Sequence, residues 1–279
     1  MSLFFVDSGS DLTKEQIKKL GIECLSFDYL MENELSEIED ETKAYSKIKK
    51  GLDIKVKQKT KKEYQEIFEP CLKQGDDVFY IASSLYVNDN LYKSKDVLVE
   101  KYPDRKFEIV ENKNFSIGGG MVAYNLALEY RKGASVDELK EKADMFVNNY
   151  ALYFAVDRLE GLKNCGLIGN NAINVNALNL KPMISVDLDG KLNVIDKISG
   201  KKRVITKLVE YIRQTGKNVA DYPIGIMYSN NTVDADELKQ KIHEYFGEEI
   251  VVICNKVGIE NIGITGLGVL GISFHVHSK

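Results

Sequence analysis

The chain of 279 residues contains no tryptophan, four prolines, four cysteines and three histidines. The cysteines lie far apart, without the paired spacing of zinc or redox sites, and we expect buried, reduced thiols. They are Cys24, Cys71, Cys165 and Cys254. So few cysteines and histidines form no pattern typical of a transition-metal site. The sequence therefore predicts neither a metal site nor a disulfide framework.

Long apolar runs and a strong charge imbalance are also missing. No stretch approaches the roughly 20 apolar residues that a membrane-spanning helix needs, and the N-terminus lacks the basic segment and cleavage site of a secretory signal. With 38 basic and 42 acidic residues the net charge is −4, which gives no electrostatic reason to expect nucleic acid. We expect a cytoplasmic globular protein without a membrane span.

Short apolar runs alternate with helical patterns in the first half of the chain. The runs are SLFFVD, IECLSF, DVFYIA and FEIV, and this alternation predicts a mostly parallel sheet with helices on its faces. One long helix is predicted over residues 135–156, and Asp189-Gly190 then predicts a hairpin with a two-residue turn. The pattern indicates a two-lobed α/β protein, with residues 1–155 as an N-terminal α/β lobe and 156–279 as a C-terminal α+β lobe.

Four polar residues crowd the end of the first predicted strand, namely Asp7, Ser8, Ser10 and Asp11. Thr13 and Gln16 have the spacing of a capping box for the helix that follows, and Gly21 predicts its end. Ligands bind at the carboxyl edge of open α/β sheets, so this loop is a candidate rim of a ligand site. The loop lacks the ligand spacing of a calcium-binding loop. We expect Asp7 and Ser8 to fix neighbouring loops by hydrogen bonds.

A glycine-rich segment allows a second interpretation, that of a nucleotide-dependent enzyme. Gly118, Gly120 and Ala123 have the GxGxx(G/A) spacing of dinucleotide-binding proteins. That motif belongs directly after the first strand, whereas here it follows the fourth predicted strand across a loop. Close packing of a helix on the sheet is the favoured interpretation. Since no GxSxG, P-loop or HExxH motif occurs, the sequence predicts no catalytic residues and no cofactor.

Six segments in order along the chain carry a family resemblance. They are VDSGSDL, FEPCLKQGDDVFYIASS, NKNFSIGGGMVA, RLEGLKNCG, ALNLKPMISVDLDGKL and ITGLGVLGISFH. Together they cover essentially the whole chain, which resembles the DegV family of bacterial fatty-acid-binding proteins. The resemblance implies a long-chain fatty acid between two lobes, with its tail in an apolar tunnel and its carboxylate held by hydroxyl and basic groups. In some family members a separate fatty-acid kinase subunit phosphorylates that carboxylate, and the carrier itself holds no nucleotide.

The positions that match the family's ligand site depart from its pattern. Val56 stands at a carboxylate-binding threonine, Leu167 at an arginine and Ile264 at a histidine. The lipid-binding positions that the resemblance implies are Val56, Ser83, Ser84, Asn88, Asn90, Leu167, Ile264, Thr265 and Gly266. The three apolar replacements predict that the chain binds a neutral lipid at least as well as a free fatty acid and serves a kinase subunit poorly.

Two interpretations of these positions remain open. In one, the tunnel persists and its head end is rebuilt for a less acidic lipid, with polar contacts from Ser83, Ser84, Asn88, Asn90 and Thr265. In the other, the lobes close over a filled core and the protein acts through protein partners or regulates active relatives. For each polar candidate the local alternative is a turn-forming residue bonded to the nearby backbone.

Overall fold

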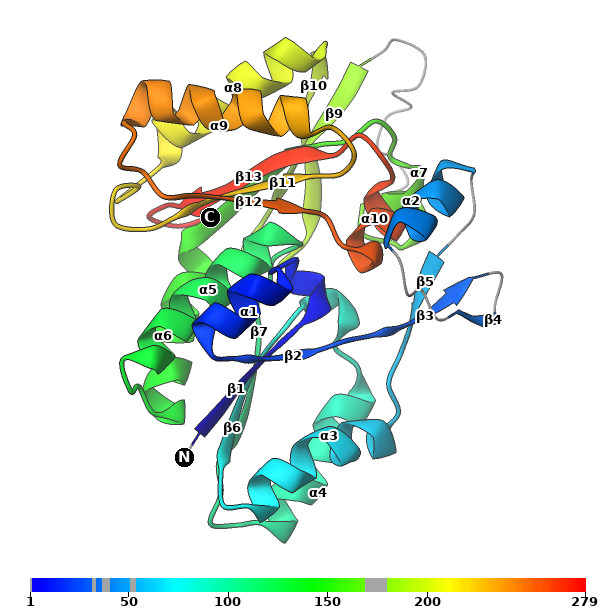
Figure 1. Ribbon diagram of the computed structural model, residues 1–279, viewed down its shortest axis with the longest axis vertical. Helices are drawn as coiled ribbons and strands as arrows, with labels where there is room; N and C mark the ends of the chain where they lie inside the picture. Colours follow the sequence, from blue (N-terminus) through cyan, green and yellow to red (C-terminus); the bar gives the residue numbers. More distant parts are fainter. Residues whose placement is uncertain (1, 32–33, 37–40, 51–53, 169–179) are drawn as a thin grey trace.

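The computed structural model describes residues 2–31, 34–36, 41–50, 54–168 and 180–279. Figure 1 shows a four-stranded sheet below a six-stranded sheet, with helix α5 (Ile117–Arg131) between them. The predicted two-lobed α/β architecture is confirmed. We name the lobes by these sheets, the N-terminal lobe by the four-stranded sheet and the C-terminal lobe by the six-stranded one.

The sheet of the N-terminal lobe is parallel throughout, with strand order β2-β1-β6-β7. Its strands are β1 (Ser2–Asp7), β2 (Glu23–Leu25), β6 (Asp77–Ala82) and β7 (Phe107–Glu111). Five of the six residues of β6 are buried, because helices cover both faces of this sheet, as is usual for parallel sheets. Three of the four strands fall within the apolar runs of the sequence, and β7 extends one residue beyond the run FEIV.

Helices on the two faces of this sheet bury alternate residues of its strands. They are α1 (Lys14–Leu20), α3 (Lys61–Lys73), α4 (Asp89–Lys101), α5 and α6 (Val136–Asn149), with short 3-10 turns η1 (Ser8–Ser10) and η2 (Ser84–Tyr86). Phe5 of β1 lies on the side of α3 and α4, and Phe4 on the side of α5. The capping box of Thr13 and Gln16 at the start of α1 is confirmed.

The C-terminal lobe contains a mixed sheet with strand order β10-β9-β8-β13-β11-β12. Its strands are β8 (Tyr150–Ala155), β9 (Leu180–Val186), β10 (Leu192–Ser199), β11 (Ile224–Tyr228), β12 (Val252–Lys256) and β13 (Leu270–His275). The helices of this lobe are α7 (Glu160–Asn164), α8 (Lys201–Thr215), α9 (Thr232–Phe246) and α10 (Ile259–Thr265). Helices α8 and α9 cover one face of the sheet, as Figure 1 shows.

The prediction of one helix over residues 135–156 is wrong. Helix α6 ends at Asn149, and Tyr150–Ala155 forms strand β8, which pairs with β9 and β13. The segment YALYFA is apolar and aromatic almost throughout, and periodicity alone does not separate such a strand from a buried helix. Because β8 lies in the six-stranded sheet, a division by sheets falls before residue 150. The predicted lobe boundary at 155/156 stays a prediction.

The hairpin is confirmed, but its turn is longer than predicted. Val186 pairs with Leu192, so the loop runs from Asp187 to Lys191. The Gly190 amide donates to the Asp187 carbonyl at 3.0 Å, and the Asp187 amide to the Lys191 carbonyl at 3.0 Å. Gly190 has φ +81°, which places it in the left-handed bulge position of a longer hairpin loop.

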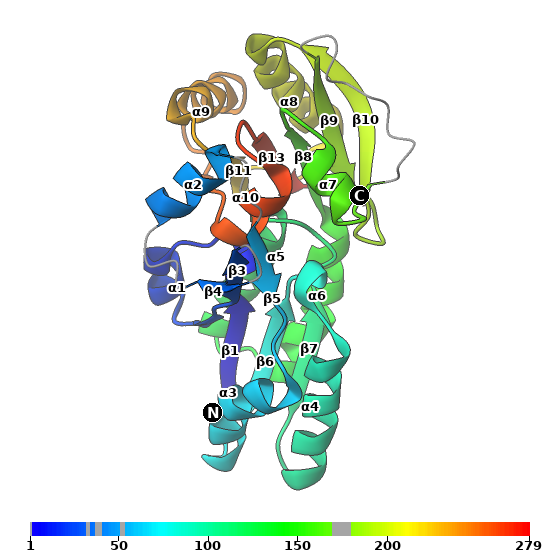
Figure 2. The same ribbon diagram turned by 90° about the vertical axis from the view of Figure 1, so that its right-hand side faces the viewer.

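A third, antiparallel sheet was not predicted from the sequence. Its order is β4-β3-β5, with β3 (Asp28–Met31), β4 (Glu34–Ser36) and β5 (Ile54–Lys57). This small sheet and helix α2 (Glu41–Lys49) lie beside α10 of the C-terminal lobe, as Figure 2 shows. The sequence ETKAYSKIKKG predicts a helix with Gly51 at its end, and Gly51 lies outside the described residues.

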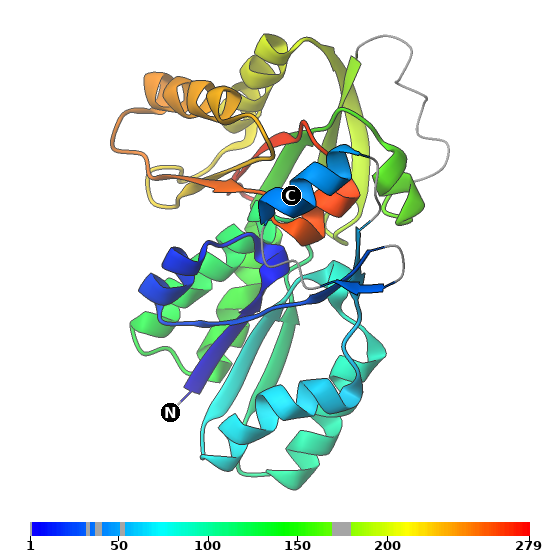
Figure 3. The same ribbon diagram turned by 45° about the vertical axis from the view of Figure 1, so that its right-hand side comes forward.

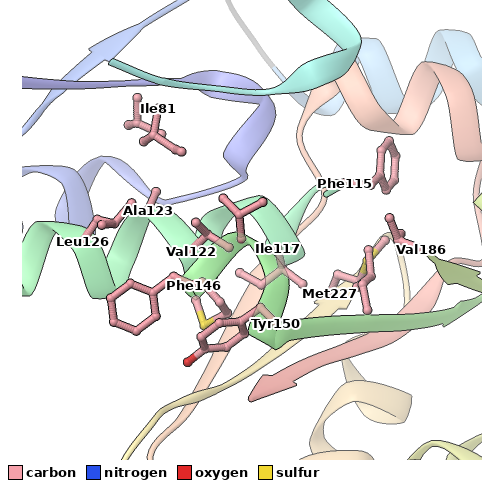
Figure 4. Packing of buried hydrophobic residues seen from close by; sticks show 14 of the residues in the cluster. Ile81, Phe115, Ile117, Val122, Ala123, Leu126, Phe146, Tyr150, Val186 and Met227 are labelled. Atoms are coloured by element: carbon pink, nitrogen blue, oxygen red, sulfur yellow. The ribbon is translucent and has the colours of Figure 1, made fainter. Parts of the chain in front are cut away.

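One apolar core joins the two lobes. In Figure 4, Ile81 of β6, Ile117 and Val122 of α5, and Met227 of β11 belong to the same buried cluster. Helix α5 is buried on most of its sides, as expected of a helix that is apolar all round. No helix within the described part of the chain is long and apolar enough to cross a membrane.

The expectation of buried cysteines is wrong for two of the four. Cys24 lies on the edge strand β2 and Cys165 directly follows α7, and both are exposed. Cys71 and Cys254 are half-buried. All four lie in the described ranges, and none forms a disulfide there.

Candidate functional site

Strand β1 ends at Asp7, whose carboxylate is buried at the carboxyl edge of the parallel sheet. Its oxygens accept hydrogen bonds from the Tyr80 hydroxyl at 2.9 Å, the Ser83 amide at 2.7 Å and the Ser83 hydroxyl at 2.6 Å. Burial raises the pKa of Asp7 to about 6, although these hydrogen bonds act in the opposite direction. Asp7 therefore connects the ends of β1 and β6, in agreement with the expectation that it fixes neighbouring loops.

Asp11 connects the same loop to the C-terminal lobe. Its backbone is left-handed, with φ 55° and ψ 22°, a conformation that aspartate adopts more readily than most residues. Its carboxylate accepts hydrogen bonds from the Ser116 hydroxyl, from the Gly258 amide at 2.8 Å and from the Asn261 side chain at 3.0 Å. Burial raises the pKa of Asp11 to about 7; the bond from Ser116 opposes this shift, and the charge of Glu260 adds to it.

Helix α10 presents two buried polar side chains, Glu260 and Asn261, to the N-terminal lobe. Glu260 accepts hydrogen bonds from the Ser8 hydroxyl and, at 2.6 Å, from the Tyr29 hydroxyl. Asn261 accepts a hydrogen bond from the Tyr86 hydroxyl at 3.2 Å. These bonds fix α10 against η1, β3 and η2, so the junction of the lobes contains a specific polar contact.

We call the three buried carboxyl groups of Asp7, Asp11 and Glu260 the acidic seam. Their exposed fractions are 0%, 6% and 4%. Among the residues that the structure describes, none of the three forms an ion pair with a lysine, arginine or histidine, and no cluster of acidic, histidine or cysteine side chains there is placed to hold a metal ion. The donors that the described structure gives these groups are hydroxyl and amide groups.

The glycines of the GxGxx(G/A) segment approach other protein atoms closely. A Cβ added at Gly118 or Gly119 would overlap the side chain of Asn114 or Asn112, and one at Gly120 would overlap the backbone carbonyl of Ser10. The start of α5 is therefore packed against the loops that follow β1 and β7. This agrees with the close-packing interpretation of the segment.

Ser83 and Ser84, predicted as lipid contacts, make hydrogen bonds within the protein. Ser83 donates its hydroxyl proton to Asp7, and the Ser84 hydroxyl accepts from the Lys113 amide at 3.0 Å. Ser83 is buried and Ser84 half-buried. Their predicted contact with a ligand stays a prediction.

Thr265 and Gly266 form the end of α10. The Thr265 hydroxyl donates to the Asn261 carbonyl one turn earlier, at 3.1 Å. Gly266 has φ +69° and its amide donates to the Ile262 carbonyl, so it caps the helix. Both residues have a structural role that accounts for them, and their predicted role at a lipid site stays untested.

Asn88 has the local backbone bonds of the alternative, whereas Asn90 bonds to a distant part of the chain, and the predicted lipid contact of both residues stays a prediction. The Asn88 side chain caps α4, accepting from the amides of Asn90 at 2.9 Å and Leu91 at 3.2 Å. It also donates to the Gln58 side chain at 2.5 Å, and the Asn90 side chain donates to the Lys59 carbonyl at 3.2 Å. These bonds tie the start of α4 to the segment between β5 and α3.

The three apolar replacements lie on α10 itself, on β5 and just after α7, and both β5 and α7 contact α10. Figure 3 shows α10 in orange-red, beside α2 in blue and α7 in green. Ile264, in the last turn of α10, and Leu167, just after α7, pack against the core shared by the lobes. Val56, on β5, packs against the other cluster of the N-terminal lobe and pairs with Tyr29 of β3. All three side chains are half-buried.

Sequence reasoning missed the residues of α10 that join the lobes. Glu260 and Asn261 are the consecutive polar residues in the otherwise mostly apolar segment GIENIGIT. A charged residue in such a short buried segment needs partners. That pattern marks the position, although the partners Ser8 and Tyr29 lie 252 and 231 residues away in the sequence.

Solved structures share this fold. A stearic acid-binding protein from Eubacterium ventriosum is 19% identical, with a TM-score of 0.84 over 98% of this chain and 97% of its own. The fatty acid kinase B3 protein of Streptococcus pneumoniae, solved with linoleic acid, is 15% identical, with a TM-score of 0.83 over 99% of this chain and 100% of its own. At these identities the likeness establishes the fold.

The sequence comparisons identify the family. A family model described as an uncharacterised protein of the DegV family matches residues 4–276. A DegV domain-containing protein of Clostridium perfringens is 30% identical over 281 aligned positions, which cover 98% of this chain and 96% of the relative. The match spans both sheets and the junction between them. The chain therefore belongs to the DegV family.

Proposed function

We propose that the protein binds a long-chain fatty acid or a related lipid between its two lobes and carries it without reacting with it. The observation that supports this most is a set of half-buried apolar side chains that pack against the core shared by the lobes. They come from η2, β9, α10 and the segments that follow α7 and α10: Leu85, Leu167, Leu180, Ile264 and Leu267. Half-buried apolar side chains beside a deep core are suited to the walls of an acyl-chain site.

The energetics of such a site are favourable. Each buried methylene contributes about 0.8 kcal/mol, so an acyl chain of roughly sixteen carbons gains on the order of 10 kcal/mol before the cost of association. The polar end of the ligand must find hydrogen-bonding partners, because an unpaired buried polar group costs several kcal/mol. Ile264 lies on α10, the helix whose Glu260 carboxyl group accepts hydrogen bonds at the junction of the lobes.

The relatives support the same proposal. Of two proteins with this fold, one is a stearic acid-binding protein and the other was solved with linoleic acid. One of them is a fatty acid kinase B3 protein, so a kinase subunit is the protein partner that this kinship suggests. We expect the protein not to react with its ligand, because the carboxyl groups of Asp7, Asp11 and Glu260 are engaged in hydrogen bonds from hydroxyl and amide groups of the protein. The cytoplasmic location stays a prediction.

The alternative is a protein of the same fold that binds no lipid and acts through protein partners. Native mass spectrometry of freshly purified protein separates the two. We expect mass adducts in the range of long-chain lipids, which organic extraction releases and fragmentation identifies. A ligand-free mass, together with no binding of any long-chain lipid in titration, contradicts the proposal and favours the alternative.

A further inference from the structure

The charge at the junction of the lobes bears on the head group of the ligand, and this inference rests on the proposed lipid-binding function. The three carboxyl groups of the acidic seam are buried and come from both lobes. Their described partners are hydroxyl and amide groups: Tyr80, Ser83, Ser8, Tyr29, Ser116, Gly258 and Asn261. An anion held at this junction therefore faces three carboxyl groups with which no described lysine, arginine or histidine pairs.

Glu260 is the member of the seam next to the apolar positions. Glu260 and Ile264 are four residues apart on α10, so they lie on the same face of the helix. Tyr29 donates its hydroxyl proton to Glu260 and pairs with Val56 across strands β3 and β5. Ile264 therefore lies on the same helix face as Glu260, and Val56 pairs with the residue whose hydroxyl group Glu260 accepts.

Several hydroxyl groups near these positions already donate their protons to the protein. Ser8 and Tyr29 donate to Glu260, Ser83 donates to Asp7, and Thr265 donates to a carbonyl of its own helix. An ionised carboxylate needs such donors or a cation, since a buried charge is tolerated only when it is paired. A hydroxyl head group instead donates to a carboxylate oxygen, and an ester adds no charge.

We propose that the ligand held between the lobes has an uncharged head group, an alcohol or an ester, and that Glu260 sets this preference. The buried acyl tail contributes the same binding free energy to every ligand of one chain length. The difference between head groups therefore comes from charge. A carboxylate within a few ångströms of a buried carboxylate is disfavoured strongly enough to lower its affinity at least roughly tenfold.

The test measures three ligands of one chain length at neutral pH: stearic acid, its methyl ester and the corresponding alcohol. Each competes with the same fluorescent neutral acyl probe for the purified protein. We expect the ester and the alcohol to bind at least about tenfold more tightly than the acid. In Glu260→Gln, which keeps an acceptor oxygen for Ser8 and Tyr29, the acid should gain about tenfold while the ester stays unchanged.

Two further variants keep the test decisive. Glu66→Gln, on the exposed surface of α3, is the matched control and should change none of the three affinities. If Glu260→Gln does not fold, Leu167→Arg places a cation at the junction and should strengthen binding of the acid alone.

The outcomes separate the inference from the function on which it rests. Tighter binding of the acid than of the ester by the unmodified protein overturns the inference and leaves lipid binding intact. Equal effects of Glu260→Gln on acid and ester also overturn it. Failure of all three ligands to bind overturns both proposals.

Discussion

The buried carboxyl group of Asp11 predicts an unusual dependence of stability on pH. Its pKa rises from 3.8 to about 7 on folding, mainly because burial disfavours the charged form. At about 1.4 kcal/mol per pKa unit, this shift of about three units corresponds to about 4 kcal/mol. Because the folded state holds the proton more tightly, this contribution is fully present below about pH 4 and is lost as the pH rises through about 7.

Between about pH 5 and pH 8 we expect the free energy of unfolding to fall by about 2–3 kcal/mol through Asp11 alone. Burial also raises the pKa of Asp7, to about 6, which acts in the same direction over a lower range. Burial lowers the pKa of His275, which acts in the opposite direction. The comparison of a variant with the unmodified protein removes these other contributions.

Asp11→Asn removes the titration and keeps the shape of the side chain. The hydrogen bond from the Asn261 side chain loses its carboxylate acceptor, which costs about 1–3 kcal/mol at every pH in this range. The pH dependence is therefore the informative quantity. In urea unfolding at a series of pH values, the free energy of unfolding of Asp11→Asn should rise relative to that of the unmodified protein as the pH rises. The control Asp104→Asn, at an exposed position, should show the same dependence of the free energy of unfolding on pH as the unmodified protein.

The reasoning is refuted if the two unfolding profiles run parallel between about pH 5 and pH 8. That result would mean that Asp11 carries the same charge in the folded and unfolded states throughout this range. A loss of stability in Asp11→Asn that grows with pH would be stronger evidence against it. In that case the ionised carboxylate stabilises the fold.

Three further predictions concern packing, the junction and a helix cap. Gly120→Ala should lower the free energy of unfolding by about 2–4 kcal/mol, because its Cβ overlaps the Ser10 carbonyl. The control Gly21→Ala has open space around its Cβ and should lower the free energy of unfolding by only about 1 kcal/mol, because of its positive φ. Asn261→Ala should lower the free energy of unfolding by about 1–3 kcal/mol and increase amide hydrogen exchange in η1 and α10. Unchanged exchange in these elements would contradict the role of Asn261 in joining the lobes. Ser135→Ala should cost about 1 kcal/mol in thermal or urea unfolding, since it removes the capping box of α6, and an unchanged midpoint would count against this.

Local patterns in the sequence predicted much of the N-terminal lobe. The run Ser2–Asp7 is a strand, Thr13 and Gln16 form a capping box, and the glycine-rich start of α5 is packed against the loops that follow β1 and β7. These features depend on residues close in the chain, where propensity, capping and periodicity act. The motif order likewise indicated the DegV family, which the family model and the relative establish.

Features that depend on distant partners were mispredicted or missed. Tyr150–Ala155 is a strand because β9 and β13 lie on either side of it, and no neighbour in the sequence signals that pairing. The turn at Gly190 was misjudged because the register of β9 and β10, not the dipeptide alone, sets the length of the loop.

The candidate site shows the same division. The sequence by itself determined that apolar residues stand at positions 56, 167 and 264, and that Asp7 and Asp11 follow the first strand. Only the tertiary structure decided that Glu260 of α10 meets Ser8 and Tyr29, more than 200 residues earlier in the chain. Burial and hydrogen bonding at that junction fix the charge that a ligand meets, and both arise only when the two lobes pack together.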